Sequence, residues 1–417
     1  MNEIATRSVR PTLKRKIMSN KLKGNAVVGQ SGGPTAVINQ SLIGVIEEVY
    51  EQENINELLG AVHGVEGILN ENFINLKQIS RKDLEVVART PSAALGSSRM
   101  KPKQEHCNQI FEVFRKNNVR YFFYIGGNDS ASSAHIIDTL AQDAGYDLKV
   151  FHVPKTIDND LLVTDHCPGF DTAATFVAQA IIGNDLDNRS LPGIKVDIIM
   201  GRNAGFLTAS SVLARRHEGD GPHLIYVPER PVNMDKFCND VCEVYDRLGR
   251  CLVVISEGIC DEDHVPWAQR IHKEVEADAH GNVQLSGSGA LAEFISVKLK
   301  EALPGKRMRT DTYGYLQRSL PGVVSPVDAY EARYCGRMAV SYAAKDNTTG
   351  SVCMQRFGKD DRYRVETFVT SLDSVAVKTK SLPDMYINEE GNNINESFYE
   401  YVSPLAGPLP EVGFLRS

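Results

Sequence analysis

The stretch PKTIDND, residues 154–160, places Lys155, Thr156, Asp158 and Asp160 within six residues. It directly follows LKVFHV, a run typical of a β-strand. A carboxylate of Asp158 or Asp160 could take a proton from a hydroxyl group, and Lys155 could offset negative charge on a transferring group. Phosphoryl transfer needs a base, cations and accurate positioning, so this stretch indicates that chemistry. The structural alternative is an Asx-rich turn with a surface lysine.

Two glycine-rich turns, GQSGGPT at 29–35 and GGNDS at 126–130, each lie between a strand-like run and a helical run. Glycines let the backbone approach a ligand closely, and a helix N-terminus attracts anions, so both turns are candidate phosphate sites. Neither matches GxGxxG or GxxxxGKS/T, which disfavours a dinucleotide-binding fold and a P-loop. A tight turn without a ligand is the equal alternative for SGG. Asp129 is unexpected at an anion site, because its negative charge lowers anion affinity.

Arginines and one glutamate occur in other short polar segments, several of them directly after strand-like runs. They are Arg99 in ALGSSRMKP, Arg202 in MGRNAG, Glu257 in SEG, Arg318 in YGYLQR, and Arg309 shortly before that segment. Guanidinium groups bind phosphate oxygens, and a carboxylate binds hydroxyls, so these residues suit a sugar phosphate. Each residue alone is more often structural.

The elements that must position these side chains alternate between strands and helices. Strand-like runs occur at 25–30, 58–64, 121–127, 148–155, 194–202, 223–229 and 251–258, and helical runs at 36–50, 171–188 and 233–249. This alternation predicts an α/β protein with two doubly wound parallel-sheet domains. Because ligands bind outside the carboxyl ends of parallel strands, the polar segments are expected to line one crevice or two facing crevices.

Length and composition limit the function classes. The chain has 417 residues, which favours two domains, and its net charge of −7 argues against a nucleic-acid-binding protein. It contains no apolar run of about 20 residues, so no membrane association is expected. Eight cysteines without a CxxC pair indicate reduced thiols in the cytoplasm. Residues 1–23 are expected to form a flexible arm, about 260–308 an exposed helical insertion, and LPDMYINEEGNNINESF at 382–398, within the last forty residues, to be loop-like.

Seven motifs together resemble one known family. SGGPTAVIN, LGSSR, GGNDS, PKTIDND, MGRNAGFLTA, SEG and YGYLQR occur in this order and resemble the phosphofructokinase family between residue 24 and about 340. They are most similar to its pyrophosphate-dependent branch. The resemblance implies two α/β domains with the active site between them, and Mg²⁺ as cofactor. The implied reaction is reversible phosphoryl transfer from pyrophosphate to the 1-hydroxyl of fructose 6-phosphate, in a homodimer or homotetramer.

The resemblance also implies roles for individual residues. On the donor side are Gly32, Arg99, Gly127 and Asp129. Catalysis is assigned to Asp158 as the base, with Lys155, Asp129 and Arg202. The sugar phosphate is bound by Thr156, Ile157, Asp158, Asp160, Met200, Gly201, Arg202, Glu257, Arg309, Tyr315 and Arg318, with the last three in part across a subunit contact.

Two positions bear on the donor, and one bears on the metal. ATP-using members commonly have glycine at the position of Asp129 and a small residue at that of Lys155. A carboxylate at 129 would repel a nucleotide α-phosphate, so both positions favour pyrophosphate. Asn128 stands where the family usually has an acid for Mg²⁺. Asn128 brings no charge, so the ligand set is open among Asn128, Asp158 and Asp129.

Three alternatives are less well supported. An ATP-dependent 6-phosphofructokinase conflicts with Asp129 and Lys155, and a non-catalytic regulatory subunit would be expected to lack the base or the lysine. A dinucleotide-binding dehydrogenase lacks its fingerprint. The expected domains are 24–170 with about 315–365 for the donor, and 171–314 with about 366–417 for the sugar phosphate. No segment matches an effector site, so little regulation is expected.

Overall fold

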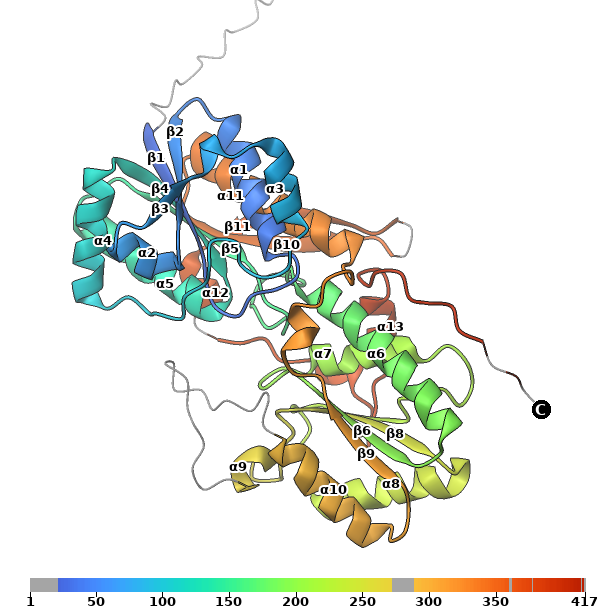
Figure 1. The fold of residues 1–417 in the computed structure, drawn as a ribbon. Helices are drawn as coiled ribbons and strands as arrows, with labels where there is room; N and C mark the ends of the chain where they lie inside the picture. The colour runs from blue at the N-terminus through green and yellow to red at the C-terminus, as the bar shows by residue number, and fades with distance from the viewer. Residues whose placement is uncertain (1–21, 272–288, 360–361, 377, 414, 416–417) are drawn as a thin grey trace, which may run out of the picture.

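The chain folds into two halves, each built around its own sheet (Figure 1). The computed structural model describes residues 22–271, 289–359, 362–376, 378–413 and 415. Residues 1–21 of the expected arm and residues 272–288 of the expected insertion therefore lie outside the described residues. Among the described helices, none combines the length and the apolar character that crossing a membrane requires.

The first half contains a seven-stranded sheet of order β11-β10-β5-β4-β1-β2-β3. Its strands are β1 (Gly24–Gln30), β2 (Ile55–Ala61), β3 (Phe73–Asn75), β4 (Val119–Gly126), β5 (Lys149–Pro154), β10 (Gly350–Phe357) and β11 (Arg364–Thr370). All neighbouring strands are parallel except β2 with β3 and β10 with β11. The segment PKTIDND begins at the last residue of β5, an interior strand of this sheet with β10 and β4 as its neighbours.

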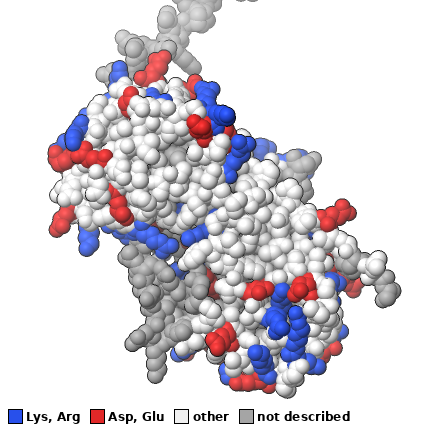
Figure 2. Space-filling view, viewed as in Figure 1, with Lys and Arg blue, Asp and Glu red and all other residues white. Residues whose placement is uncertain are grey.

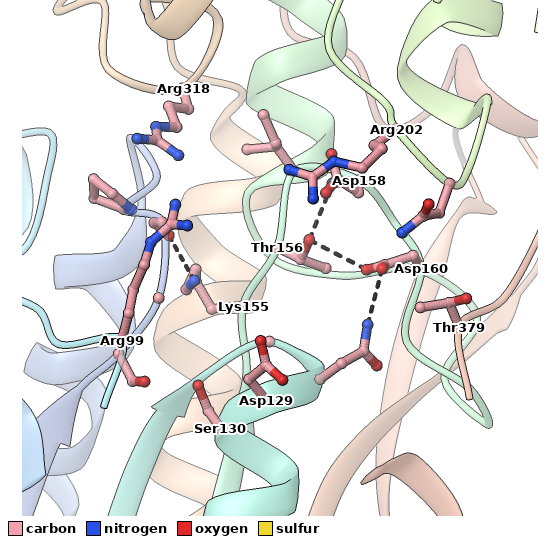
Figure 3. Close-up of a pocket in the computed structure, with 18 of the residues that line it drawn as sticks. Arg99, Asp129, Ser130, Lys155, Thr156, Asp158, Asp160, Arg202, Arg318 and Thr379 are labelled. Atoms are coloured by element: carbon pink, nitrogen blue, oxygen red, sulfur yellow. Dashed lines mark hydrogen bonds between the residues drawn. The ribbon is translucent and has the colours of Figure 1, made fainter. Parts of the chain in front are cut away.

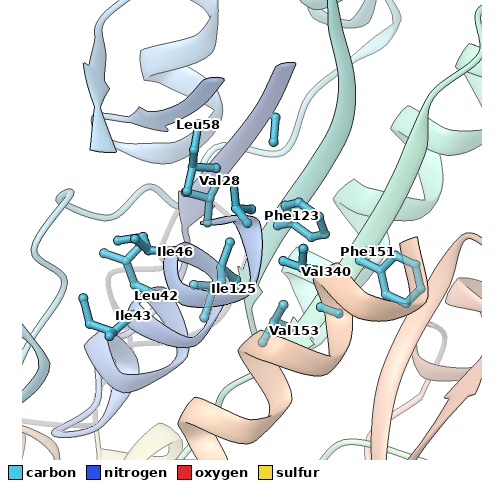
Figure 4. Packing of buried hydrophobic residues seen from close by; sticks show 14 of the residues in the cluster. Val28, Leu42, Ile43, Ile46, Leu58, Phe123, Ile125, Phe151, Val153 and Val340 are labelled. Carbon is cyan, nitrogen blue, oxygen red and sulfur yellow. The ribbon is translucent and has the colours of Figure 1, made fainter. Parts of the chain in front are cut away.

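Helices cover both faces of this sheet because alternate residues of each strand point to opposite sides. The buried residues of β1 and β4 accordingly belong to two apolar clusters, one on each face of the sheet. Val28 and Phe123 lie in the first cluster, and Val27 and Phe122 in the second. Figure 4 shows the first cluster, where α1 and α11 pack on the strands. The helices of this half are α1 (Ile38–Tyr50), α2 (Gly64–Leu69), α3 (Arg81–Ala88), α4 (Gln104–Lys116), α5 (Asn128–Asp143), α11 (Pro326–Lys345) and α12 (Leu372–Ala376), with the 3-10 turn η1 (Leu76–Gln78).

Two glycines let α1 and α11 pack at close range. A Cβ on Gly44 would lie 2.0 Å from the carbonyl oxygen of Arg333, and one on Gly336 would lie 2.1 Å from that of Ser41. Neither position can hold a larger residue without moving the helices apart. This contact brings a late segment of the chain onto the first sheet.

The second half contains a four-stranded parallel sheet of order β7-β8-β6-β9. Its strands are β6 (Ile194–Ile199), β7 (Leu224–Tyr226), β8 (Cys251–Ser256) and β9 (Met308–Thr312). Its helices are α6 (Phe170–Ser190), α7 (Phe206–Ala209), α8 (Met234–Leu248), α9 (Trp267–Ile271), α10 (Ala290–Ala302) and α13 (Glu396–Val402), with the 3-10 turns η2 (Ser210–Ala214), η3 (Gly314–Arg318) and η5 (Asp384–Tyr386). Apolar clusters on both faces of this sheet confirm the predicted fold class.

The structure differs from the sequence expectations at three places. Helix α10 is not an exposed insertion, because Leu291, Ile295 and Leu299 are buried in the second half's core. The expected division between 365 and 366 falls inside β11, and α12 then packs against α5 of the first half. The segment expected to be loop-like, 382–398, includes η5 and the start of α13, whose Phe398 is fully buried.

Candidate active site

A cavity of about 350 Å³ lies between the two halves, at the carboxyl ends of the parallel strands. Segments that follow β1, β4, β5, β6 and β8 line it, which is the arrangement that the polar segments predicted. Its lining comprises Ser31, Gly32, Gly33, Pro34, Ser98, Arg99, Met100, Lys101, Gly127, Asn128, Asp129, Ser130, Ser133, Lys155, Thr156, Ile157, Asp158, Asp160, Met200, Arg202, Asn203, Ala204, Glu257, Tyr315, Arg318 and Thr379. Figure 2 shows Lys and Arg side chains gathered where the halves meet.

All the predicted site residues line this cavity except Gly201 and Arg309. Gly201 has a φ of +136°, a conformation that side chains rarely adopt, and it turns the chain so that Arg202 faces the cavity. Arg309 lies on β9, is exposed, and donates its Nη1–H to the backbone oxygen of Met308. Within one chain, the structure therefore separates Arg309 from the other predicted residues.

A hydrogen-bonded network holds the two aspartates after β5 (Figure 3). Thr156 Oγ1 accepts from the backbone N–H of Asp158 at 3.1 Å and donates to Asp160 Oδ1 at 3.3 Å. Asn128 Nδ2 donates to Asp160 Oδ2 at 2.8 Å. Both carboxylate oxygens of Asp160 are thus engaged within the protein, whereas Asp158 is only partly buried and faces the cavity.

Burial changes the acidity of both aspartates. Burial and the neighbouring charge of Asp158 raise the pKa of Asp160 to about 7. Burial also raises the pKa of Asp158, although Arg202, Lys155 and Arg318 oppose the increase. A carboxylate with a raised pKa is a stronger base once it is deprotonated. The pair can therefore accept a proton from a bound hydroxyl group near neutral pH.

Lys155 lies beneath the first glycine turn. Its side chain is 3% exposed, and Nζ donates to the backbone oxygen of Gly33 at 2.6 Å. Its pKa is lowered to about 8: burial is the largest cause, the charges of Arg318 and Arg99 act in the same direction, and those of Asp158 and Asp160 oppose the shift. A desolvated ammonium group interacts strongly with a phosphate in the same cavity.

The glycine turn also makes room for Arg318. A Cβ on Gly33 would lie 2.5 Å from Arg318 Nη1, so a side chain there would displace the guanidinium group. Gly32 has a φ of +74°, which glycine adopts without strain. Arg318 itself stacks over the ring of Tyr315, with 4.6 Å between the guanidinium carbon and the ring centroid. The turn between β1 and α1 therefore accepts a hydrogen bond from Lys155 and leaves space for the guanidinium group of Arg318.

Arg202 approaches Asp158 from the second half of the protein (Figure 3). Its Nε is buried and has no hydrogen-bond partner among the described residues. Glu257, which follows β8, also lines the cavity from the second half. A buried donor without a partner is costly, so an anionic ligand is the natural partner for Arg202.

Sequence reasoning did not select several lining residues. Lys101 Nζ lies 2.5 Å from Asp129 Oδ1, and both side chains are about half exposed. Lys101 belongs to the segment ALGSSRMKP, so its position two residues after Arg99 was an available signal. Thr379 offered no such signal, because it comes from a late segment in which the backbone N–H of Lys380 donates to the backbone oxygen of Asp160.

The cavity's oxygen atoms fit a hard divalent cation. Asn128 Oδ1 is buried and accepts no hydrogen bond from the described part of the chain. The carboxylates of Asp158 and Asp129 line the same cavity. Carboxylate and amide oxygens are the ligands that Mg²⁺ takes in proteins, together with waters and substrate phosphates.

Comparisons with known proteins agree with this geometry. The family model described as Phosphofructokinase matches residues 25–343. A pyrophosphate–fructose 6-phosphate 1-phosphotransferase from Rhodospirillum rubrum is 51% identical over 395 residues, which are 94% of this chain and 97% of that protein. The crystal structure of a pyrophosphate-dependent phosphofructokinase from Nitrosospira multiformis is 31% identical, with a TM-score of 0.81 over 94% of both chains. That of another from Marinobacter aquaeolei is 32% identical with the same TM-score, over 94% of this chain and 93% of the other.

Proposed function

The chain belongs to the phosphofructokinase family, and we propose that it is a pyrophosphate-dependent 6-phosphofructokinase. It transfers a phosphoryl group from pyrophosphate to the 1-hydroxyl of fructose 6-phosphate, giving fructose 1,6-bisphosphate and phosphate. The free energy change of phosphoryl transfer from pyrophosphate to a hydroxyl group is small, so the reaction runs in both directions. The observation that carries the choice of donor is the presence of Asp129 and Lys155 in one cavity.

The donor occupies the part of the cavity formed by the first half. The glycine turn at Gly32 and the side chain of Arg99 face pyrophosphate, with Gly127 keeping the second turn open. The backbone N–H of Gly32 is itself donated to the backbone oxygen of Ser98 at 2.9 Å, so Gly32 makes room for the donor rather than binding it through that group. Lys155 offsets the charge that builds on the phosphoryl group and on the leaving phosphate. Asp129 stands where a nucleotide α-phosphate would lie and disfavours donors longer than pyrophosphate.

The acceptor lies toward the second half. Asp158 takes the proton of the sugar 1-hydroxyl, the hydroxyl oxygen bonds to phosphorus, and the bond from phosphorus to the leaving phosphate breaks. Thr156 fixes the backbone of Asp158 through its hydrogen bond. Contacts to the sugar phosphate come from Thr156, Ile157, Asp158, Asp160, Met200, Arg202, Glu257, Tyr315 and Arg318.

A magnesium ion fits this arrangement. Asn128, Asp158 and Asp129 would hold it, with waters and the donor's oxygens completing its coordination. When bound, Mg²⁺ neutralises phosphate charge and orients the donor. The protein's own share is to position the acceptor hydroxyl, to remove its proton and to surround the phosphates with cations.

Arg309 suggests that subunits share sites. It is exposed on β9, outside the cavity of its own chain. We propose that it binds the 6-phosphate at a neighbouring subunit in a homodimer or homotetramer, located in the cytoplasm. We also propose that each half forms a domain, and that the chain leaves the first domain for the last time after α12 rather than within β11.

Initial rates with alternative donors test the proposal. Fructose 1,6-bisphosphate formation is measured from fructose 6-phosphate and Mg²⁺ with either pyrophosphate or ATP. Product is expected with pyrophosphate alone. Equal or faster product formation with ATP would overturn the donor assignment. Product with neither donor, in an assay where a known enzyme is active, would favour a regulatory subunit instead.

A further inference from the structure

A buried cluster of titratable side chains lies outside the active-site cavity. His166 belongs to the loop after PKTIDND, Asp171 to the first turn of α6, and Glu331 to the second turn of α11. Their exposures are 0%, 0% and 2%. Helix α11 packs on the first sheet and α6 on the second, so the cluster lies where the two halves join.

The three side chains point toward one another. One potential ligand atom from each, a ring nitrogen of His166 and a carboxylate oxygen of Asp171 and Glu331, all lie within 4.8 Å of one another. His166 Nε2 is 2.6 Å from Glu331 Oε2 and 4.0 Å from Asp171 Oδ2. A ring nitrogen and two carboxylates facing one point are a common set of ligands for a divalent metal.

Of the three side chains, Asp171 is the one whose burial is not compensated by hydrogen bonds. Neither of its carboxylate oxygens accepts a hydrogen bond from a described residue, although the side chain is completely buried. The neighbouring buried carboxylate of Asp328 shows the usual solution, since it accepts backbone N–H groups of Gly169 and Thr172 at 2.8 and 3.0 Å. A buried carboxylate without donors is costly unless it takes up a proton or binds a cation. Burial raises the pKa of Asp171, but a protonated Asp171 would still have no acceptor for its O–H among the described residues, whereas a cation would engage its oxygens directly.

The orientation of His166 matches that of a metal ligand. Its Nδ1 lies 3.1 Å from Asp165 Oδ1, so that carboxylate can accept the Nδ1–H and leave Nε2 facing Glu331 and Asp171. Metal-binding histidines usually hold a carboxylate or carbonyl on their other nitrogen in this way. The second oxygen of Glu331 is fixed separately, because Tyr363 donates its hydroxyl to Oε1 at 2.7 Å.

An ion pair between protonated His166 and Glu331 is the alternative. It explains the 2.6 Å contact but supplies no donor to Asp171, which lies 4.0 Å from the ring. The nearby cation Arg356 has its Nη1 3.9 Å from Asp165 and does not hydrogen-bond to Asp171 either. A divalent cation, in contrast, balances both carboxylates while the imidazole is neutral.

We propose that His166, Asp171 and Glu331 form a structural site for a divalent transition-metal ion, of which Zn²⁺ suits the mixed nitrogen and oxygen ligands best. The ion replaces the proton shared by His166 and Glu331, and that proton leaves to solvent. Zn²⁺ ligands lie about 2.0–2.2 Å from the ion and hence roughly 3–3.5 Å apart, so a shift of Glu331 by about 1 Å brings the three side chains to that spacing. Both oxygens of Asp171 lack hydrogen-bond partners among the described residues, so this carboxylate can supply two of the four ligand atoms. The ion ties α6 to α11 and fixes the loop that follows Asp158 and Asp160.

Metal binding to the purified full-length protein tests this site. The protein is stripped with a chelator, and Zn²⁺ or Co²⁺ is added in excess Mg²⁺, which occupies the oxygen-only sites. One ion per chain is expected, with a rise in melting temperature and a Co²⁺ visible spectrum of nitrogen and oxygen ligands. Absence of a stoichiometric ion, or a Co²⁺ spectrum with thiolate charge-transfer bands, would overturn the proposal.

Variants separate this site from its rivals. His166→Gln should lose the ion, and Asp165→Asn should bind it about 10–100-fold more weakly, because it removes only the group that orients the ring. The double variant Cys238→Ser/Cys242→Ser removes the two cysteines one turn apart on α8 and should bind the ion as tightly as the unchanged protein. If the cysteine variant loses the ion, or both His166 and Asp165 variants keep full affinity, the site lies elsewhere. Should His166→Gln fail to fold, Asp165→Asn and the Co²⁺ spectrum still decide.

Discussion

Lys101 Nζ lies 2.5 Å from Asp129 Oδ1, so the carboxylate at the mouth of the donor pocket is paired with a cation. This pairing explains how a negative charge is tolerated beside a phosphate site. Lys155 lines the same cavity, is buried and contributes a second positive charge (Figure 3). A small dianion or trianion can therefore bind between the lysines, while a longer donor must pass the carboxylate.

Replacing Asp129 by glycine should admit ATP as a donor. At an effective dielectric constant of about 20, unit charges ~6 Å apart repel by ~3 kcal/mol, and exposure together with Lys101 reduces this to about 1–2 kcal/mol. The ratio of kcat/KM for ATP to kcat/KM for pyrophosphate should thus rise about tenfold. Rates with both donors check this. An unchanged ATP rate would show that another part of the pocket excludes the nucleotide.

Replacing Lys101 by methionine should weaken pyrophosphate binding. The substitution removes a cation that lines the pocket and leaves the charge of Asp129 without its partner. The KM for pyrophosphate should rise about tenfold, in line with ~1.5–3 kcal/mol for a hydrogen bond to a charged group, while kcat changes little. Lys103→Met is the matched control, because Lys103 is exposed nearby but does not line the cavity. Equal KM values for the two variants would contradict the role of Lys101.

The pH dependence should report Lys155. Burial lowers its pKa to about 8 in the free protein, so its positive charge is present below that pH and is lost above it. The kcat/KM for pyrophosphate should therefore fall as the pH rises through 8. Lys155→Arg keeps the charge and should move this limb to higher pH, at a lower maximum rate. In Lys155→Met, any remaining change of kcat/KM with pH near 8 comes from ionisation of the substrate. If this variant and the unchanged protein had identical pH profiles, titration of Lys155 could not be the cause of the fall.

Much of this site could be predicted because parallel strands present their carboxyl ends at one edge. The segments after β1, β4, β5, β6 and β8 each carried recognisable polar residues, and the fold brings them to one cavity. Lys155 and Asp158 were predictable for the same reason. Their burial and the resulting pKa shifts were not, because these depend on how the two halves close around them.

Other features leave no local pattern in the sequence. Thr379 enters the cavity from a segment more than two hundred residues away from Asp158. Arg309 lies in β9, whose sequence MRTDT shows no clear alternation of apolar and polar residues. The sequence therefore did not indicate on which side of the strand the Arg309 side chain lies. His166 and Glu331 are separated by 165 residues, and only the packing of α6 near α11 brings them together.

Replacing Asp158 by asparagine should remove the base. A general base contributes about 10²–10⁴-fold, so kcat should fall by that factor with little change in the KM for fructose 6-phosphate. Because burial raises the pKa of Asp158, kcat/KM of the unchanged protein should fall toward acid pH as this carboxylate binds a proton. Asp160→Asn removes the like charge beside Asp158 and should shift this limb to lower pH. If Asp158→Asn retained full kcat, the base would have to be another group.

Magnesium dependence should identify the role of Asn128. Its Oδ1 is buried without a hydrogen-bond partner among the described residues, and its Nδ2 is anchored by Asp160, so the oxygen is held ready for a cation. Chelation of Mg²⁺ should abolish turnover and its return should restore it. Asn128→Leu, which has a similar volume but no oxygen, should raise the Mg²⁺ concentration needed for half-maximal rate about tenfold at saturating pyrophosphate. Ser133→Ala is the matched control on the same helix, since Ser133 lines the cavity but donates its hydroxyl to the backbone oxygen of Asp129. An equal Mg²⁺ requirement in both variants would assign the ion to the carboxylates alone.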